Sequence, residues 1–110
     1  MADIIAYARY IEDLITAIKT RYTELPELGV AKAQTAMEYE KALAIAIVGL
    51  KGEHPVSILE KIAKGECVKQ LYDKMVAESA YKACITKIEA NKAQLNAYQS
   101  LFRHLDTAQR

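Results

Sequence analysis

Apolar side chains recur at steps of three and four along the first quarter of the chain. Between Asp3 and Leu25 they follow a seven-residue repeat, which places them on one stripe of a helix. The members of this stripe are Ile4, Ala8, Ile11, Ile15, Ile18, Tyr22 and Leu25. Asp3 stands at the start of the pattern, where its carboxylate suits an N-cap. The pattern predicts an amphipathic helix that must bury this stripe against another helix.

Pro26 interrupts the first pattern. Proline lacks an N–H and restrains the residue before it, so the sequence predicts a break or a kink there. A second helical pattern follows, over about residues 30–50. Its apolar face consists of Ala33, Ala36, Met37, Leu43, Ala44, Ile47 and Leu50. The strongest stop signal in the chain is the run Lys-Gly-Glu-His-Pro at residues 51–55, in which Gly52 suits the C′ position after a helix.

A short helix and a long one are predicted after this stop. Ser57 and Glu60 have the spacing of a capping box, and Gly65 predicts the end or a bend of the short helix. No Gly or Pro occurs from Glu66 to about Leu105, which predicts a helix of about 40 residues and 60 Å. One apolar row of this helix is Tyr81, Ile88, Leu95 and Phe102, and its companion is Cys84, Asn91, Tyr98 and Leu105. Val68, Leu71, Met75 and Val76 extend the stripe toward the start of the helix.

The length of the last helix constrains the fold. One partner of about 24 residues cannot cover about 60 Å of helix, whereas the first two segments laid end to end can. We therefore expect an all-α single domain over residues 1–110, built as a long antiparallel helical hairpin. Its first arm would be kinked at Pro26, and the short helix would lie at the tip. The alternative is a three-helix bundle in which the first two segments fold back on each other.

Either fold would leave part of a long apolar stripe exposed, and exposed stripes of this kind mark association surfaces. The sequence therefore predicts a homo-oligomeric helical bundle, most simply an antiparallel dimer with four long helices. The expected oligomer interface consists of Ile4, Ile11, Ile18, Tyr81, Ile88, Leu95, Tyr98 and Phe102.

Charge and cysteine content narrow the class of protein. The 110 residues include 15 Lys and Arg against 14 Asp and Glu, a net charge of +1. Proteins that neutralise the phosphates of duplex DNA are usually strongly basic, and mimics of DNA are strongly acidic. The charge of this chain is nearly balanced, so it fits neither class. No secretory signal and no membrane span is recognisable. Cys67 and Cys84 lie about 25 Å apart on one predicted helix, so they are free or intermolecular, and a cytoplasmic location is the simpler reading.

Residues with the potential for catalysis or metal binding are sparse. His54 and His104 are the only histidines, and they stand far apart in the predicted hairpin. Neither HExxH nor CxxC occurs, so the sequence predicts no metal, no cofactor and no enzymatic activity. Cys84 falls on the apolar stripe and is expected to pack there. Asn91 on the same stripe either fixes helix register or is partly exposed.

Two groups of residues are candidates for binding a partner. Lys61, Lys64 and Lys69 gather near the predicted tip, and their positive charge makes this the place where nucleic acid would be expected to bind. Tyr7 and Tyr10 lie off the apolar stripe, so they are the tyrosines best placed for a partner surface. The other tyrosines on the stripes are expected to pack.

The stretch from Tyr39 to Arg103 resembles a family of small helical proteins encoded by phages and prophages. The segments that carry the resemblance are Tyr39, Lys41 to Ala44, Pro55 to Leu59, Ile62 to Gly65, Ala77 to Ala83, Ile88 to Ala90, Lys92, and Leu95 to Arg103. They reproduce the family's order of a Pro-Val-Thr/Ser segment, an Ala-(Arg/Lys)-Gly turn and an Ala-Glu-x-x-Tyr-Lys-Ala run. The first thirty residues match only in being helical, and Pro26 departs from the uninterrupted helix that the family implies.

Members of this family are often encoded near phage recombination, replication or single-strand-binding genes. The resemblance implies a phage or prophage protein in the cytoplasm of a bacterial host cell, and it assigns no catalytic residue. The expected function is non-enzymatic self-association and binding of another protein in phage DNA metabolism. One alternative is a counter-defence protein that binds and inhibits a host immune effector. Another is an accessory protein that binds single-stranded nucleic acid.

Overall fold

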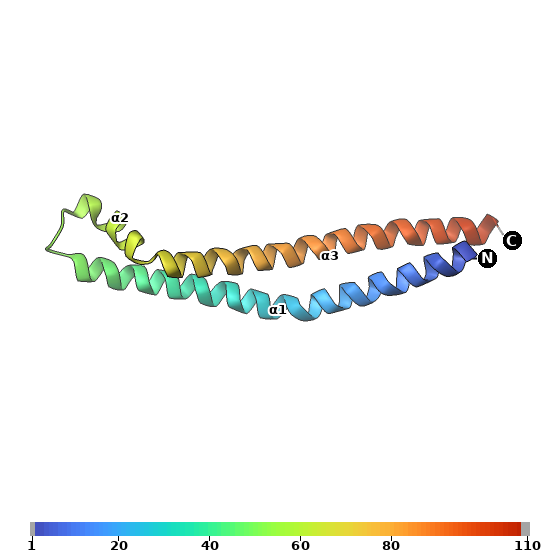
Figure 1. Ribbon diagram of the computed structural model, residues 1–110, viewed down its shortest axis with the longest axis horizontal. Coiled ribbons are helices and arrows are strands. Elements are labelled where there is room, and N and C mark those ends of the chain that lie inside the picture. Colours follow the sequence, from blue (N-terminus) through green and yellow to red (C-terminus); the bar gives the residue numbers. More distant parts are fainter. Residues whose placement is uncertain (1, 109–110) are drawn as a thin grey trace. The chain divides into compact units, whose positions relative to one another are not determined.

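A computed structural model describes residues 2–108, and these residues form three helices (Figure 1). The helices are α1 (Ala2–Leu50), α2 (Val56–Glu66) and α3 (Val68–Ala108). The described residues contain no strand, and Lys51 and His54 form an isolated bridge between α1 and α2. None of the helices in this part of the chain is both long and apolar enough to cross a membrane. The predicted all-α class is confirmed.

Pro26 lies inside α1 and does not end it. The two segments predicted on either side of it belong to one helix. Of the predicted break or kink, the break is therefore wrong, as is the alternative in which these segments fold back on each other, and the kink stays a prediction. Pro26 is exposed, so the carbonyl that loses its intrahelical partner can be hydrated instead. Asp3 lies in the first turn of α1 rather than at an N-cap, and a carboxylate there still suits the helix dipole.

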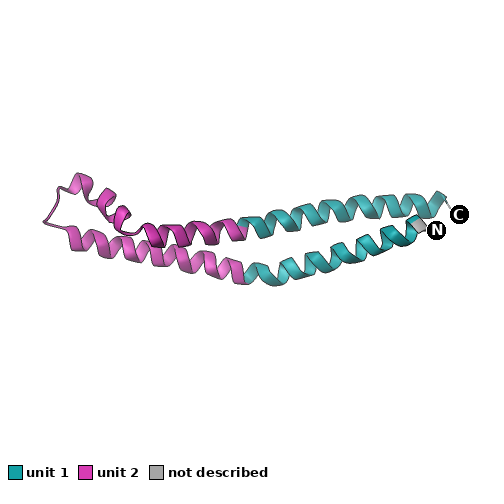
Figure 2. Ribbon diagram, in the orientation of Figure 1, with its two compact units in different colours: residues 1–26, 82–110 teal, residues 27–81 magenta. Residues whose placement is uncertain are grey.

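Contacts divide the chain into two compact units, and one boundary falls at Pro26 (Figure 2). Unit 1 comprises Met1–Pro26 and Lys82–Arg110, and unit 2 comprises Glu27–Tyr81. The single-domain organisation stays a prediction.

In unit 1 the first half of α1 runs antiparallel beside the second part of α3 (Figure 2). Cys84 and Ile88 of α3 are buried against α1, and the Cys84 thiol donates to the carbonyl of Arg21 at 3.5 Å. The expected packing role of Cys84 is therefore confirmed. Asn91, one turn beyond Ile88, is half-buried.

Unit 2 holds a small apolar core. Leu50 at the end of α1 packs with Leu59 and Ala63 of α2, surrounded by the half-buried side chains of Leu43, Ala46, Ile47 and Ile62. Tyr39 and Cys67 are also buried in this unit. The short helix is therefore part of the core rather than an appendage.

The turn after α1 is closed by Gly52. This residue has φ +89°, a left-handed conformation that favours glycine, at the C′ position that the sequence predicted. The N–H of Glu53 donates to the carbonyl of Leu50 at 3.2 Å, and that of Lys51 donates to Val48 at 3.3 Å. These bonds satisfy carbonyls that the helix end would otherwise leave unpaired.

The predicted capping box of α2 is wrong. Helix α2 begins at Val56, its N-cap is Pro55, and no side-chain cap hydrogen bond forms, so Ser57 lies within the first turn. Pro55 has φ −60° and ψ 142°, and its fixed φ lets the helix start directly after it. Glu60 pairs with Lys64 one turn onward at 3.2 Å instead of reaching back to the N-terminus.

Gly65 does not end α2, which continues to Glu66. The chain leaves the helix only at Cys67, whose N–H donates to the carbonyls of Ala63 and Lys64. The N–H of Leu71 donates in turn to the carbonyl of Cys67 at 3.0 Å, so α3 begins one residue after the interruption. Because Cys67 is buried directly before α3, its position sets which side of α3 faces inward at the start of that helix.

Replacing Gly52 with Ala is expected to lower the free energy of unfolding by about 1 to 2 kcal/mol, because Cβ is unfavourable at positive φ. Gly49 is the matched control. It lies within α1 with open space around its Cα, so Gly49→Ala should be neutral or raise stability by up to about 1 kcal/mol. Urea unfolding at fixed protein concentration measures both, and equal effects would contradict the assigned turn.

Replacing Pro26 with Ala is expected to raise the free energy of unfolding by about 1 to 2 kcal/mol. The substitution restores a backbone donor inside α1, and the lost restraint on the unfolded chain offsets part of the gain. Glu27→Ala, at the next exposed position, is the control. A lower melting temperature for Pro26→Ala than for the control would show that the proline stabilises the native helix.

Candidate functional site

The residues predicted to form an oligomer interface are all at least partly buried within the chain. Ile88 is buried, and the other seven are half-buried. Ile11 and Phe102 line one groove between α1 and α3 in unit 1, and Leu25 and Ile88 line another. Their pairing within the chain uses much of their apolar surface, and their part in an oligomer stays a prediction.

Three tyrosines form a cluster in unit 1. The Tyr98 ring lies 5.7 Å from the Tyr7 ring and 5.4 Å from the Tyr10 ring, measured between centroids, and Tyr7 and Tyr10 are 6.2 Å apart. These are distances of packed aromatic rings. A cage for a ligand cation needs open space between its rings, which this cluster does not have. Tyr7 is half-buried and Tyr10 remains 46% exposed, so only Tyr10 offers a sizeable surface to a partner.

Lysine side chains lie over tyrosine rings across the helix pairs. In unit 2, the Lys32 ammonium lies 4.8 Å from the centre of the Tyr81 ring. Lys74 lies 5.2 Å from the ring of Tyr39, which is itself buried. In unit 1, Lys92 lies 5.1 Å from the Tyr22 ring. Each contact joins α1 to α3, so these lysines stabilise helix pairing and are poorly placed to bind a partner.

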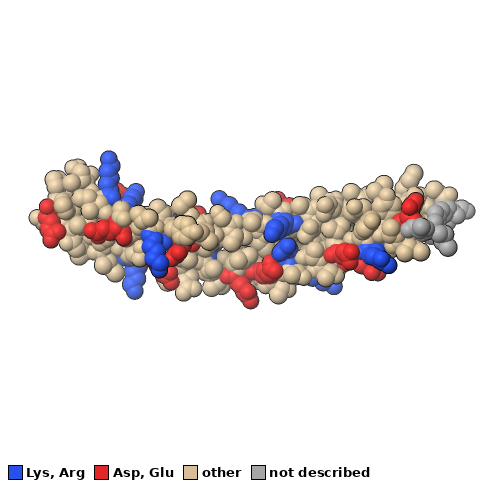
Figure 3. Space-filling view, viewed as in Figure 1, with Lys and Arg blue, Asp and Glu red and all other residues tan. Residues whose placement is uncertain are grey.

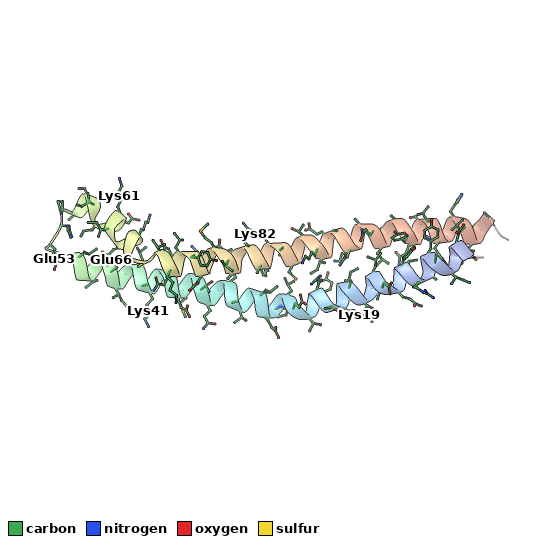
Figure 4. All side chains as sticks on the ribbon, in the orientation of Figure 1. Lys19, Lys41, Glu53, Lys61, Glu66 and Lys82 are labelled. Carbon is green, nitrogen blue, oxygen red and sulfur yellow. The ribbon has the colours of Figure 1, made fainter. Side chains whose placement is uncertain are left out.

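The tip lysines do not form a basic patch. Lys64 pairs with Glu60, and Lys61 extends from α2 away from α1 (Figure 4). Glu53 and Glu66 bring negative charge to the same part of unit 2. On the face shown in Figure 3, Lys and Arg lie among Asp and Glu along both units. Lys69 belongs to α3 and lines a different groove, together with Asp73 and Lys41.

Groups capable of metal binding or catalysis do not gather in the described part of the chain. No cluster of three or more His, Cys, Asp or Glu side chains could hold a metal ion there. His54 and His104 are exposed, and Cys67 and Cys84 are free and buried. That the protein lacks a cofactor and an enzymatic activity stays a prediction.

Large apolar side chains are exposed mainly in unit 2. Fifteen large hydrophobic residues among those described are exposed, and ten of them belong to this unit. The ten are Val30, Met37, Ile45, Val48, Val56, Ile58, Val68, Tyr72, Met75 and Val76. Exposed apolar side chains that gather in one part of a protein mark interaction surfaces, so unit 2 is the better candidate for binding.

Four of these residues, Val68, Tyr72, Met75 and Val76, lie on the side of α3 that its buried row leaves free. The sequence prediction put three of them on the buried stripe, and this is wrong. The repeat of Tyr81 and Cys84, continued strictly by sevens, reaches residues 67, 70, 74 and 77, which are buried or half-buried. These positions hold Cys, Gln, Lys and Ala rather than large apolar residues. Strict continuation of the heptad was thus the signal that could have identified the exposed side.

No protein-family model matches the chain, and comparisons with curated proteins and with solved structures found no match. The resemblance to a phage protein family therefore stays a prediction.

Replacing Tyr98 with Ala is expected to lower the free energy of unfolding by about 2 to 3 kcal/mol, because its ring contacts both other tyrosines of the cluster. Tyr10→Ala removes a ring that is nearly half exposed and should cost about 1 kcal/mol or less. Chemical denaturation compares the two variants. A cost for Tyr10→Ala as large as that for Tyr98→Ala would contradict the assigned packing.

Proposed function

We propose that the chain is a non-enzymatic helical interaction protein that associates with itself and binds another protein. The observation that carries this proposal is the imbalance between buried and exposed apolar side chains. Seven hydrophobic residues are buried in the described part of the chain. No large side chain there is fully buried, since each keeps at least 2% of its surface exposed. Fifteen large hydrophobic residues are exposed. A soluble helical chain of this composition gains stability when a partner covers such side chains.

The exposed surface supports the same proposal. The chain exposes 7980 Å². A compact monomer of its mass, 12.3 kDa, would expose about 6100 Å². The excess is about 1900 Å² per chain, and a homodimer that buried it on both sides would fall among obligate homodimers, which bury roughly 2000–5000 Å² in total.

In the assembly that we propose, each chain is a long antiparallel helical hairpin, with α2 at its tip and a kink at Pro26. Two chains combine as a four-helix bundle. The supporting observations are the antiparallel pairing of α1 with α3 in unit 1 and the position of Pro26 at the boundary between the units.

The partner that we propose is a protein of phage DNA recombination or replication, in the cytoplasm of a bacterial host. This part rests on the resemblance of residues 39–103 to phage-encoded helical proteins. A host immune effector is the alternative partner. Direct binding of single-stranded nucleic acid is less favoured, because the tip combines lysines with glutamates and Lys64 is already paired.

Sedimentation equilibrium should give a homo-oligomer, most simply a dimer, at micromolar protein concentration. Self-association driven by apolar contacts should persist in high salt, since screening weakens charge contacts and leaves apolar ones. A monomer at high micromolar concentration would overturn the proposed self-association.

Affinity capture of the tagged chain from infected and uninfected host cells tests the partner. Recovery of a phage replication or recombination protein supports the leading proposal, and recovery of a host defence protein supports the alternative. Salt-dependent binding of a labelled single-stranded oligonucleotide, measured in parallel, would instead favour a nucleic-acid-binding role.

A further inference from the structure

Four large apolar side chains form an exposed patch at the start of α3. Val68, Tyr72, Met75 and Val76 are exposed by 60%, 66%, 58% and 49%. Their spacing of i, i+4, i+7 and i+8 places them within about 100° of the helix circumference. This is the spacing with which amphipathic helices present anchor side chains to a partner. We call these four residues the α3 patch.

The outer side of α1 in unit 2 differs from the α3 patch in one respect. Val30, Met37 and Val48 are similarly exposed there, but Lys41 follows Met37 by one turn and lies between these apolar residues on the same side. Figure 4 shows that Lys41 points away from α3. A charged side chain in the middle of an apolar row resists burial, whereas the arc of the α3 patch contains no charged residue.

We propose that the α3 patch binds the α3 patch of a second copy of this chain, with the two helices antiparallel about a two-fold axis near residues 71 and 72. This rests on the self-association proposed above and assigns it a surface. The two chains would overlap along the first turns of α3, so the arrangement differs from the four-helix bundle. The apolar side chains would form the desolvated centre of an isologous interface, in which each copy contributes the same residues. The surface of the patch is part of the excess of about 1900 Å² that the whole chain exposes.

Charges beside the patch favour the antiparallel direction. Lys69 and Asp73 lie one turn apart on the same flank of the α3 patch. In an antiparallel two-fold pair this flank meets its own copy in reverse order, so Lys69 lies opposite Asp73 of the second copy, twice per dimer. A parallel two-fold pair would bring this flank against the opposite flank of the second copy, so this attraction would not form. Among the described residues, neither Lys69 nor Asp73 has an ion-pair partner within 4 Å in its own chain.

A matched pair of variants tests the surface. Met75→Glu places a charge in the α3 patch, and Met37→Glu places the same charge at a similarly exposed methionine on α1 of the same unit. Both sites are exposed within the chain, so helicity measured by circular dichroism should stay unchanged in both. Sedimentation equilibrium should show that Met75→Glu raises the dissociation constant of the dimer by at least about 30-fold. Met37→Glu should leave this constant at its wild-type value.

The outcomes separate this inference from the proposed function. If the wild-type chain is monomeric, the self-association itself fails. If the wild-type chain associates and Met75→Glu associates equally well, the α3 patch is not the interface, although self-association stands. Dissociation by Met37→Glu but not by Met75→Glu would move the interface to α1 and overturn the inference.

A second variant tests the direction of the two helices. Lys69→Gln removes an attraction in the antiparallel pair and should weaken association by about two- to ten-fold at low salt. In a parallel pair Lys69 would not face Asp73 of the second copy, so the same substitution would leave association unchanged, which would overturn the proposed geometry. Lys61→Gln is the control, because this exposed lysine lies on α2, outside the α3 patch and its flanks, and should leave association unchanged.

Discussion

Two helices that lie side by side can each bury only one stripe, and the rest of this structure depends on that constraint. In unit 1 the stripe of α1 faces that of α3, and Cys84 and Ile88 supply the buried centre. The described residues of this unit form no third layer that could cover the remaining sides. A pair of helices therefore keeps a thin core, and large apolar side chains outside the stripe stay exposed.

Contacts between long side chains compensate for part of the thin core. In unit 2, Lys32 of α1 lies over Tyr81 of α3, and Lys74 of α3 lies over Tyr39 of α1. The two residues on each helix are seven apart, so both contacts form in one antiparallel register. A shift of one helix by a turn would separate both pairs. These cation–π contacts thus define the pairing as well as stabilising it.

The short helix decides which side of α3 faces outward. Cys67, between α2 and α3, is buried and bonded to the last turn of α2. Because α3 begins one residue later, burial of Cys67 places Val68 on the exposed side, and Tyr72 and Met75 follow it at helical spacing. The exposed patch is therefore a consequence of how the tip is packed, and it supplies the apolar surface for which we propose a second copy.

The sequence by itself determined the helices, the buried rows around Ile88 and Cys84, and the stop at Gly52, because these depend on spacing and on local backbone preference. Only the tertiary structure decided that Pro26 is tolerated inside α1, that Ser57 does not cap α2, and which residues at the start of α3 face outward. The physical reason is that spacing defines a stripe only while apolar residues keep to one side of a helix. Where they occupy two sides, as from Val68 to Val76, the neighbouring helix selects the side that is buried.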